Sequence, residues 1–272
     1  MSSSTLSEKL DRLASRISSY ERAAVAFSGG VDSTLLLKVA RDCLGEENTL
    51  GLIAVSPSLP KAELSFARSL ASDIGARLDE VQTDETEDPR YKENTPRRCY
   101  FCKDVVYRTL GEYSQAAGFR YMLDGMNKDD ASDIRPGRVA AREQGIISPL
   151  YDCGIGKEEI REAARELGLP NWDKPAAACL ASRIPYGSEV TDAALSQIGQ
   201  AELFLKQLGF ATVRVRHTGD TARIEIPTAE IERFASLREK IVPSLKSMGF
   251  TYVSLDLEGF RSGSLNESLS QK

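Results

Sequence analysis

The feature that most constrains the fold is a six-residue loop, SGGVDS at residues 28–33, which lies between an apolar run and a helical stripe. The run at residues 22–27 (RAAVAF) is short, apolar and followed by glycines, which is typical of a buried strand. Residues 34–44 then place leucine, valine and alanine on one face at helical spacing. A strand, a tight turn and a helix in this order predict the first unit of a parallel α/β sheet, in which ligands bind at the carboxyl ends of the strands.

The residue types of this loop suit a phosphate or a pyrophosphate. Gly29 and Gly30 let the backbone turn tightly and approach a ligand. The following helix presents unpaired N–H groups and the positive end of its dipole, and Ser28 and Ser33 add hydroxyl donors. The GxxxxGK[ST] pattern of the Walker loop is absent, so the loop has no lysine of its own for the phosphates. The alternative is an ordinary turn in which Asp32 only caps the helix.

The same alternation continues through the first two-thirds of the chain. Further strands are expected at residues 49–55, 77–82 and 119–123, and further helices at residues 61–75 and 103–118. This order predicts a doubly wound parallel sheet.

The pattern changes from about residue 188. A helix is expected at residues 191–208, hairpin strands at 212–216 and 223–226, a helical stretch at 228–248 and a last strand at 252–257. This order is typical of a small α+β domain. We therefore expect two domains, residues 1–180 and 188–272, with the boundary inside the proline-rich stretch 171–187.

Composition and charge argue against several classes of protein. The 272 residues carry 35 Lys and Arg against 40 Asp and Glu, a net charge of −5, so a nucleic acid is not the expected partner. His217 is the single histidine, which disfavours a Ser-His-Asp triad and excludes a multi-histidine metal site within one chain. No apolar run is long enough for a membrane span, and the N-terminal stretch lacks the pattern of a secretory signal. We therefore expect a cytoplasmic protein with no membrane partner.

The five cysteines predict reduced thiols, because an odd number without an export signal does not suit a disulfide framework. Cys99 and Cys102 form a CxxC motif in RCYFCK at the start of a helix, where neighbouring Arg and Lys favour thiolates that can bind one metal centre. Cys179 lies in a loop between two prolines and close to Arg183, which suits reactivity better than packing.

Two interpretations of these cysteines stay open from the residues alone. Zinc requires four ligands, so Cys153 would have to join Cys99, Cys102 and Cys179. Three cysteines with an open position can instead hold a 4Fe–4S cluster whose fourth iron takes an outside ligand. Cys43, at the end of an amphipathic helix, and Cys153 are otherwise expected to be structural, because free cysteine is among the most buried residue types.

The loop SGGVDS after a first strand resembles the phosphate-binding loop of the PP-loop ATP pyrophosphatase superfamily. Members of this superfamily cleave ATP between the α and β phosphates and leave AMP on an acyl or amide oxygen. The resemblance implies that the loop holds the leaving pyrophosphate together with Mg²⁺, and that two residues of the later motif DGMNKDD line the same cleft. The residues concerned are Ser28, Gly29, Gly30, Asp32 and Ser33 in the loop, and Gly125 and Asn127 in the later motif.

Six motifs taken together resemble one family of this superfamily, the LarE-type ATP-dependent sulfur transferases of nickel-pincer cofactor biosynthesis. They are SGGVDS, RCYFCK, DGMNKDDASDIRPG, SPL followed by GKEEIR, KPAAACLASRIPYG and DLEGFRSGSLNE, in that order between residues 13 and 267. The resemblance implies that ATP adenylates a carboxylate of pyridinium-3,5-biscarboxylic acid mononucleotide and that sulfur then displaces AMP to leave a thiocarboxylate. It also implies a homo-oligomer, and it does not identify the donor that supplies the sulfide.

The family uses two sources of sulfur, and both can be carried onto this chain. In some members the cysteine that matches Cys179 gives up its own sulfur and becomes dehydroalanine. Others hold a 4Fe–4S cluster with a transferable sulfide on three cysteines that match Cys99, Cys102 and Cys179. Because all three cysteines are present, we favour the cluster. A sulfide or thiolate needs no general base, so a chain with one histidine can use either source.

Three arginines are candidate ligands for a phosphate or carboxylate of the nucleotide substrate: Arg183, Arg214 and Arg261. Arg214 lies on the first hairpin strand with Arg216 on the same face, because strand side chains alternate. A planar guanidinium suits either anion. Each arginine also has an ordinary alternative as a solvated or ion-paired side chain.

Two other functions are compatible with parts of this pattern. A PP-loop tRNA thiolase can also use three cysteines and a cluster, but it requires a basic surface that a net charge of −5 does not favour. A non-enzymatic ATP-binding module with structural zinc would bind ATP without releasing pyrophosphate. The loop position of Cys179 argues against that module.

Overall fold

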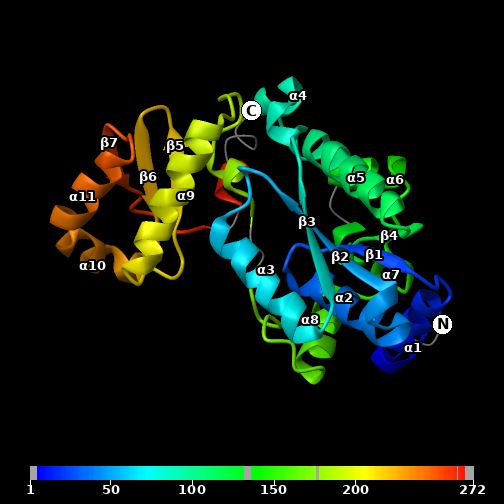
Figure 1. Ribbon diagram of the computed structural model, residues 1–272. Coiled ribbons are helices and arrows are strands. Elements are labelled where there is room, and N and C mark those ends of the chain that lie inside the picture. The colour runs from blue at the N-terminus through cyan, green and yellow to red at the C-terminus, as the bar shows by residue number, and fades with distance from the viewer. Residues whose placement is uncertain (1–4, 132–135, 176–177, 262, 267–272) are drawn as a thin grey trace. The chain divides into compact units, whose positions relative to one another are not determined.

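The structure is a computed structural model that describes residues 5–131, 136–175, 178–261 and 263–266. The chain divides into two compact units (Figure 1). The first comprises the chain up to Ser56, residues 63–85 and residues 99–177, and the second comprises residues 57–62, residues 86–98 and the chain from Ala178 onward. The two short segments, 57–62 and 86–98, thus join the C-terminal part of the chain. The division into domains 1–180 and 188–272 stays a prediction.

A four-stranded parallel sheet forms the centre of the first unit. Its strands are β1 (Ala23–Ala26), β2 (Thr49–Val55), β3 (Arg77–Gln82) and β4 (Tyr121–Leu123), in the spatial order β3-β2-β1-β4. Ala23 pairs with Thr49 on one side and with Tyr121 on the other. The chain therefore moves from β1 to β3 in one direction and returns to β4 on the far side of β1. This reversal makes a switch point at the end of β1, where the loop at residues 28–33 begins.

Helices cover both faces of this sheet, which confirms the doubly wound α/β fold. On one face, α5 (Arg98–Ala116) packs Leu110 into a cluster with Leu50 and Leu52 of β2. On the opposite face, α2 (Val31–Leu44) brings Leu37 against Gly51. The other α-helices of the first unit are α1 (Leu6–Ser18), α3 (which begins at Lys61 and ends at Ile74), α6 (Pro136–Glu143), α7 (Pro149–Asp152) and α8 (Lys157–Glu166).

The helix α1 adds to the elements predicted from the sequence. Thr5 and Glu8 form a capping box at its start, in which each side chain accepts a hydrogen bond from the backbone of the other. Leu13 and Ile17, four residues apart, are both buried. Both signals are local, so this helix could have been predicted.

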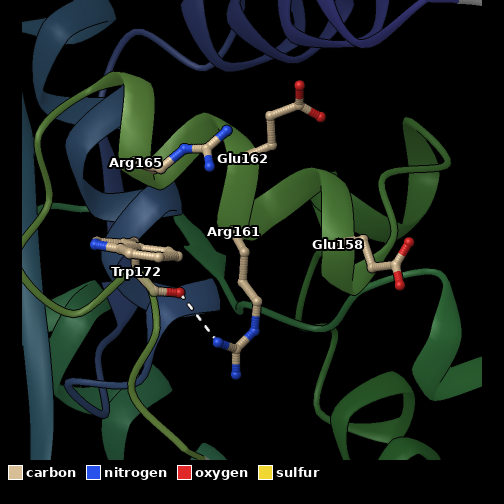
Figure 2. Close-up of a pocket in the computed structure, with 5 residues that line it drawn as sticks. All are labelled: Glu158, Arg161, Glu162, Arg165 and Trp172. Atoms are coloured by element: carbon tan, nitrogen blue, oxygen red, sulfur yellow. Dashed lines mark hydrogen bonds between the residues drawn. The ribbon is translucent and has the colours of Figure 1, made fainter.

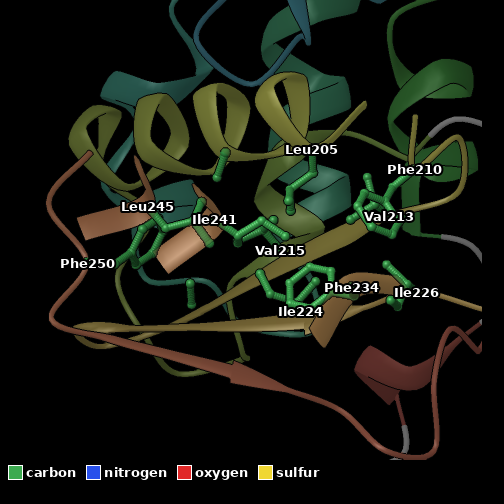
Figure 3. Packing of buried hydrophobic residues seen from close by; sticks show 12 residues of the cluster. Leu205, Phe210, Val213, Val215, Ile224, Ile226, Phe234, Ile241, Leu245 and Phe250 are labelled. Carbon is green, nitrogen blue, oxygen red and sulfur yellow. The ribbon is translucent and has the colours of Figure 1, made fainter. Parts of the chain in front are cut away.

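The second unit holds a three-stranded sheet in the order β5-β6-β7. Its elements include α4 (Pro89–Lys92), α9 (Asp192–Gln207), β5 (Arg214–Thr218), β6 (Thr221–Glu225), α10 (Ile231–Ser236), α11 (Arg238–Ser247) and β7 (Tyr252–Leu255). β5 and β6 are antiparallel, whereas β6 and β7 are parallel. Figure 3 shows the core between this sheet and its helices, where Leu205, Val215 and Ile224 lie among the buried residues.

The helical stretch expected at residues 228–248 is not one helix. A 3₁₀ turn at Thr228–Glu230 leads into α10, and α10 and α11 are separated at Leu237, whose ψ of 6° departs from helical geometry. Pro243 also lies inside α11, where it lacks the N–H that a regular helix would donate to the fourth residue before it. Among the described residues, no helix combines the length and the apolar character of a membrane-spanning segment.

Candidate functional site

The loop after β1 closes on itself at the start of α2. Gly29 has a φ of +70°, which glycine adopts without strain, and a Cβ on it would lie 3.2 Å from the Cβ of Ala67 in α3. Ser33 Oγ donates to the Gly30 carbonyl at 3.1 Å and accepts from the Ser28 backbone N–H at 3.2 Å. The result is a compact turn at the amino end of a 14-residue helix, an arrangement that binds phosphate groups.

A lysine from a distant part of the sequence brings a positive charge to this loop. Lys157 Nζ lies 2.5 Å from Asp32 Oδ2, and Asn127 Nδ2 donates to Asp32 Oδ1 at 3.3 Å. The backbone N–H of Lys157 donates to Asp129 Oδ2 at 2.6 Å, which fixes the first residue of α8. Sequence reasoning found that the loop has no lysine of its own and did not assign Lys157. The motif GKEEIR carried the available signal, because its glycine caps a helix that begins with lysine.

Gly125 lets the end of β4 approach the loop. A Cβ on Gly125 would lie 2.8 Å from the backbone nitrogen of Ser33, a contact that any larger residue would make repulsive. The preceding residue, Asp124, is buried and accepts hydrogen bonds from Tyr107 Oη at 2.9 Å and Ser148 Oγ at 2.7 Å. Burial raises the pKa of Tyr107 to about 12, so its hydroxyl stays protonated and can donate. Gly125 and Asn127, both named from the motif DGMNKDD, therefore lie beside the loop.

Asn171 holds the backbone of the loop in place, and sequence reasoning did not identify it. Its side chain is 1% exposed, and Nδ2 donates to the Gly29 carbonyl at 3.1 Å and to Thr34 Oγ1 at 3.0 Å. Thr34 Oγ1 in turn donates to the Gly30 carbonyl at 2.9 Å. The carbonyl oxygen of the Asn171 side chain is buried and has no hydrogen-bond partner among the described residues. Asn171 thus holds the carbonyls of both loop glycines, directly or through Thr34.

Two buried ion pairs lie in the second unit among the predicted substrate ligands. The Arg183 guanidinium donates to the carboxylate of Glu202 at 2.8 and 3.1 Å. The Arg216 guanidinium donates to both oxygens of Glu225 at 2.9 Å. Both glutamates therefore offset a positive charge inside the unit, and Arg183 has the ion-paired form that the sequence left open as an alternative.

Arg183, Arg214 and Arg216 form a cluster of three arginines in the second unit. Of these, Arg214 is half-buried and has no carboxylate partner among the described residues. Its guanidinium lies 4.3 Å from the centre of the Phe260 ring and donates to the Arg261 carbonyl at 3.1 Å. Its pKa is lowered, first by desolvation and then by the nearby charges of Arg183 and Arg216. An anion bound here would offset this positive charge. The Arg261 side chain is ion-paired with Glu258 at 3.0 Å.

The three predicted sulfur-centre cysteines belong to two units. Cys99 is exposed and lies in the first turn of α5, where Cys102 is half-buried, and both belong to the first unit. Cys179 is exposed and precedes the 3₁₀ helix Leu180–Arg183 of the second unit. Within either unit, no three Cys, His, Asp or Glu side chains of the described residues form a group that could hold a metal ion. Burial raises the pKa of the Cys153 thiol, which keeps it protonated.

A hollow of about 400 Å³ beside α8 does not have the features of a reaction site. Figure 2 shows its lining residues, Glu158, Arg161, Glu162, Arg165 and Trp172. The charged ends of Glu158, Arg161 and Glu162 point away from one another. Arg161 Nη1 instead donates to the Trp172 carbonyl at 3.3 Å, and Nη2 donates to the Lys174 carbonyl at 3.3 Å. These two bonds hold residues 172–174 against α8.

Comparisons with known proteins match both the region of the loop and the whole length of the chain. A family described as NAD synthase matches residues 6–100, the part of the chain that contains the loop at 28–33. The chain is 42% identical to the pyridinium-3,5-bisthiocarboxylic acid mononucleotide synthase of Lactiplantibacillus plantarum over 98% of this chain and 97% of that protein. It is 47% identical to an uncharacterized protein of Synechocystis over 98% of this chain and 100% of that protein. It is 31% identical to an uncharacterized protein of Methanocaldococcus jannaschii over 89% of this chain and 92% of that protein.

Proposed function

Because the chain belongs to the LarE-type family of ATP-dependent sulfur transferases, we infer that it converts a carboxylate of a pyridinium mononucleotide into a thiocarboxylate. The proposed substrate is pyridinium-3,5-biscarboxylic acid mononucleotide, and the reaction is a step of nickel-pincer cofactor biosynthesis. The observation that carries this proposal is the identity of 42% over nearly the whole length of a synthase of the corresponding bisthiocarboxylic acid.

The first half of the proposed reaction activates the carboxylate. A carboxylate oxygen attacks the α-phosphorus of ATP, the bond between the α-phosphorus and the bridging oxygen breaks, and pyrophosphate leaves. Ser28, Gly29, Gly30 and Ser33 would hold the leaving group through backbone N–H groups and hydroxyls. Lys157 adds a positive charge beside them. Asp32 would offer its carboxylate to the Mg²⁺ that accompanies ATP, and this ion would neutralise phosphate charge.

The cluster around Arg214 is the proposed binding site for a phosphate or carboxylate of the nucleotide. Arg183 and Arg216 are each offset by a glutamate, whereas Arg214 is not offset by a carboxylate among the described residues. A half-buried guanidinium in this state favours an anionic ligand, because the ligand restores the charge balance that burial requires. In this proposal Arg214 binds the anion directly, and the nearby positive charge of Arg183 adds to the attraction. The carbonyl of Arg261 accepts a hydrogen bond from Arg214 and orients its guanidinium.

The second half of the reaction replaces AMP by sulfur. If Cys179 is the donor, its thiolate attacks the acyl carbon, the bond from that carbon to the AMP oxygen breaks, and AMP leaves with the electron pair. Loss of the Cys179 Cα proton and cleavage of its Cβ–S bond then release the thiocarboxylate and leave dehydroalanine. No oxidant or reductant enters this sequence, and the exposed position of Cys179 permits the attack.

The alternative donor is a 4Fe–4S cluster, which we favour because the chain has all three cysteines. Cys99 and Cys179 are exposed and Cys102 is half-buried. Cysteine sulfur is the donor chemistry that such a cluster requires. The cluster would supply a sulfide for transfer, so that Cys179 would remain intact after each turnover.

The proposed function predicts two products that can be measured separately. The protein incubated with ATP, Mg²⁺ and the pyridinium biscarboxylate mononucleotide should release AMP and pyrophosphate only when the mononucleotide is present. Mass spectrometry should then show exchange of carboxylate oxygen for sulfur in the mononucleotide. Pyrophosphate release without any thiocarboxylate in a protein that retains its sulfur source would contradict the proposal.

Three further statements belong to the same proposal. We expect a homo-oligomer, which light scattering after size-exclusion chromatography measures directly. We expect a cytoplasmic protein that takes a small-molecule nucleotide rather than a nucleic acid, in keeping with the net charge of −5. Binding of tRNA that weakens steeply with salt would instead favour a tRNA thiolase.

A further inference from the structure

The peptide group between Gly29 and Gly30 is free to reverse its direction, because a glycine lies on each side of it. Gly29 has a φ of +70° and Gly30 a φ of −79°. Reversal of this peptide group turns ψ of Gly29 and φ of Gly30, and it brings the φ of Gly30 into the positive region. Glycine adopts that region without strain, so the covalent structure alone does not hold this peptide group in one direction.

The direction of this peptide group decides what the loop offers to an anion. The N–H and C=O of a trans peptide point in opposite directions, so fixing one fixes the other. The Gly30 N–H donates to the Ser28 hydroxyl at 3.4 Å, a long hydrogen bond that a phosphate oxygen can replace. The reversed peptide would present the Gly29 carbonyl oxygen in the place of this donor, and that oxygen would repel a phosphate.

Asn171 supplies the restraint that the two glycines lack. The Gly29 carbonyl precedes the N-cap residue Gly30, so it lies outside α2 and receives no helical hydrogen bond. Asn171 Nδ2, at 3.1 Å, is its only donor among the described residues. The Gly30 carbonyl, in contrast, accepts the backbone N–H of Thr34 at 3.0 Å and is held by the helix itself. The direction of the first peptide group therefore depends on Asn171.

The side-chain oxygen of Asn171 is a second, independent observation. The side chain is 1% exposed, and Oδ1 has no hydrogen-bond partner among the described residues. A buried acceptor without a partner is unfavourable for stability. The same side chain uses Nδ2 twice, toward the Gly29 carbonyl and toward Thr34 Oγ1. This combination fits a residue whose value lies in its donors.

The backbone around Asn171 is itself fixed. The Asn171 carbonyl accepts the backbone N–H of Lys174 at 3.1 Å. Arg161 of α8 donates to the Trp172 carbonyl (Figure 2) and to the Lys174 carbonyl, both at 3.3 Å. The amide group that holds the loop is thus carried by a segment bound to a helix. Every residue in this arrangement belongs to the first unit.

We propose that Asn171 is a positioning residue that prevents reversal of the Gly29–Gly30 peptide group and so keeps the Gly30 N–H directed at the bound anion. This inference rests on the proposed function, which assigns the loop to the pyrophosphate part of ATP. Asn171 acts through the loop backbone and does not itself bind the anion. Binding of Mg²⁺ pyrophosphate alone, without the mononucleotide or a sulfur source, therefore tests it.

The first measurement is calorimetric titration of the protein with Mg²⁺ pyrophosphate. Asn171→Leu removes the amide donors and keeps a side chain of similar shape. It should weaken pyrophosphate binding by about tenfold or more, because the Gly29 carbonyl is left without a donor and the peptide group can reverse.

The second measurement uses the double variant Asn171→Leu with Gly30→Ala. Alanine disfavours the positive φ that the reversed peptide requires, and a Cβ on Gly30 meets only Ser28 Oγ, at 3.4 Å. The double variant should therefore bind pyrophosphate more tightly than Asn171→Leu alone. A merely structural role for Asn171 predicts no such recovery.

Asn48→Leu is the matched control. Asn48 Nδ2 donates to the Leu44 carbonyl at 3.1 Å at the opposite end of α2, so the same change there should keep wild-type binding. Thermal unfolding identifies any variant that fails to fold. If Asn171→Leu fails, Thr34→Val and Thr34→Ser carry the comparison, because Thr34 Oγ1 orients the Asn171 amide. Valine should weaken binding and serine should retain it.

Two results would overturn the inference. One is a folded Asn171→Leu protein that binds pyrophosphate as the wild type does. The other is a double variant that binds no more tightly than Asn171→Leu. If the wild type makes the thiocarboxylate but either result is found, the proposed function stands and this inference fails. If pyrophosphate binding depends on Asn171 and recovers with Gly30→Ala while no thiocarboxylate is ever formed, the positioning role stands and the proposed function fails.

Discussion

The ammonium group of Lys157 lies 2.5 Å from the carboxylate of Asp32, although 125 residues separate the two in the chain. The pair links the first residue of α8 to the loop at the start of α2. Asp32 is also held by Asn127, so its orientation does not depend on the lysine alone. A cation and a carboxylate placed together at the amino end of a helix can serve pyrophosphate and its metal ion respectively.

Replacing this lysine should affect the ATP half-reaction. We expect Lys157→Met to lower mononucleotide-dependent exchange between ATP and labelled pyrophosphate by about 10- to 100-fold, because a charge-assisted hydrogen bond contributes about 1.5–3 kcal/mol. Lys157→Arg should retain more of the exchange. Lys38→Met, which breaks an ion pair with Asp42 on the outer part of α2, is the control and should leave exchange unchanged. Equal exchange in Lys157→Met and wild type would rule out this role.

Gly125 should tolerate no side chain. In Gly125→Ala the new Cβ would lie 2.8 Å from Ser33 N and 3.0 Å from Ser33 Cα, and both are backbone atoms that cannot rotate away. We expect the loop to be displaced, with loss of ATP binding and destabilisation of about 1–3 kcal/mol by overpacking. Calorimetric titration with ATP and thermal unfolding measure the two effects.

Gly111→Ala is the matched control for this change. Gly111 lies inside α5, and a Cβ there would meet nothing within 4 Å. Alanine is a better helix former than glycine by about 1 kcal/mol, so this variant should be more stable than the wild type and bind ATP normally. A Gly125→Ala protein that binds ATP as Gly111→Ala does would show that the loop can move aside.

The sequence predicted those parts of the fold whose signals are local. The strands β2 and β3 have the predicted bounds, because short apolar or alternating runs ended by turn residues specify them. The break at Leu237 was not predicted, because the helical pattern of residues 228–248 continues across it.

The site was predicted only in part, for a related physical reason. The loop residues 28–33 are contiguous, and their chemistry can be read directly from their order. Lys157 and Asn171 act through contacts with residues 125 and 142 positions away, respectively. No local pattern encodes such contacts, since they exist only after β1, α8 and the segment that carries Asn171 have packed. Gly125 was named through resemblance, and its close approach to Ser33 supplies the physical reason.

Arg214 and Arg183 should respond differently to the same substitution. Arg214→Gln removes a cation that is not offset by a carboxylate, so we expect a KM for the mononucleotide raised by about tenfold or more with little loss of stability. Arg183→Gln leaves the buried Glu202 without its partner and should destabilise the protein by about 3–5 kcal/mol. Steady-state kinetics and thermal unfolding separate these effects, and exposed Arg238→Gln is the control. A stable Arg183→Gln protein would contradict the buried ion pair.

The single histidine should make folding stability depend on pH. Desolvation lowers the pKa of His217 in the folded state below its usual value of 6.5, while Nε2 contacts Gln197 Oε1 at 2.9 Å. Below pH 6.5 the unfolded chain takes up a proton that the folded state resists, so stability falls as the pH falls toward the folded-state pKa. The Tm of His217→Gln should therefore change less with pH than the Tm of the wild type between about pH 7.5 and 5.5. This interval lies above the range in which most carboxylates titrate. Parallel curves for the two proteins would contradict this assignment.

Metal analysis of protein purified without oxygen should distinguish the two sulfur sources. A cluster predicts about four irons per chain with matching acid-labile sulfide. The iron should be lost in Cys99→Ala, Cys102→Ala and Cys179→Ala and kept in Cys43→Ala, since Cys43 lies at the far end of α2 from the loop. Stoichiometric zinc would contradict the cluster. A metal-free protein that makes one thiocarboxylate per chain and carries dehydroalanine at position 179 would identify Cys179 as the donor, because only Cβ–S cleavage leaves that residue.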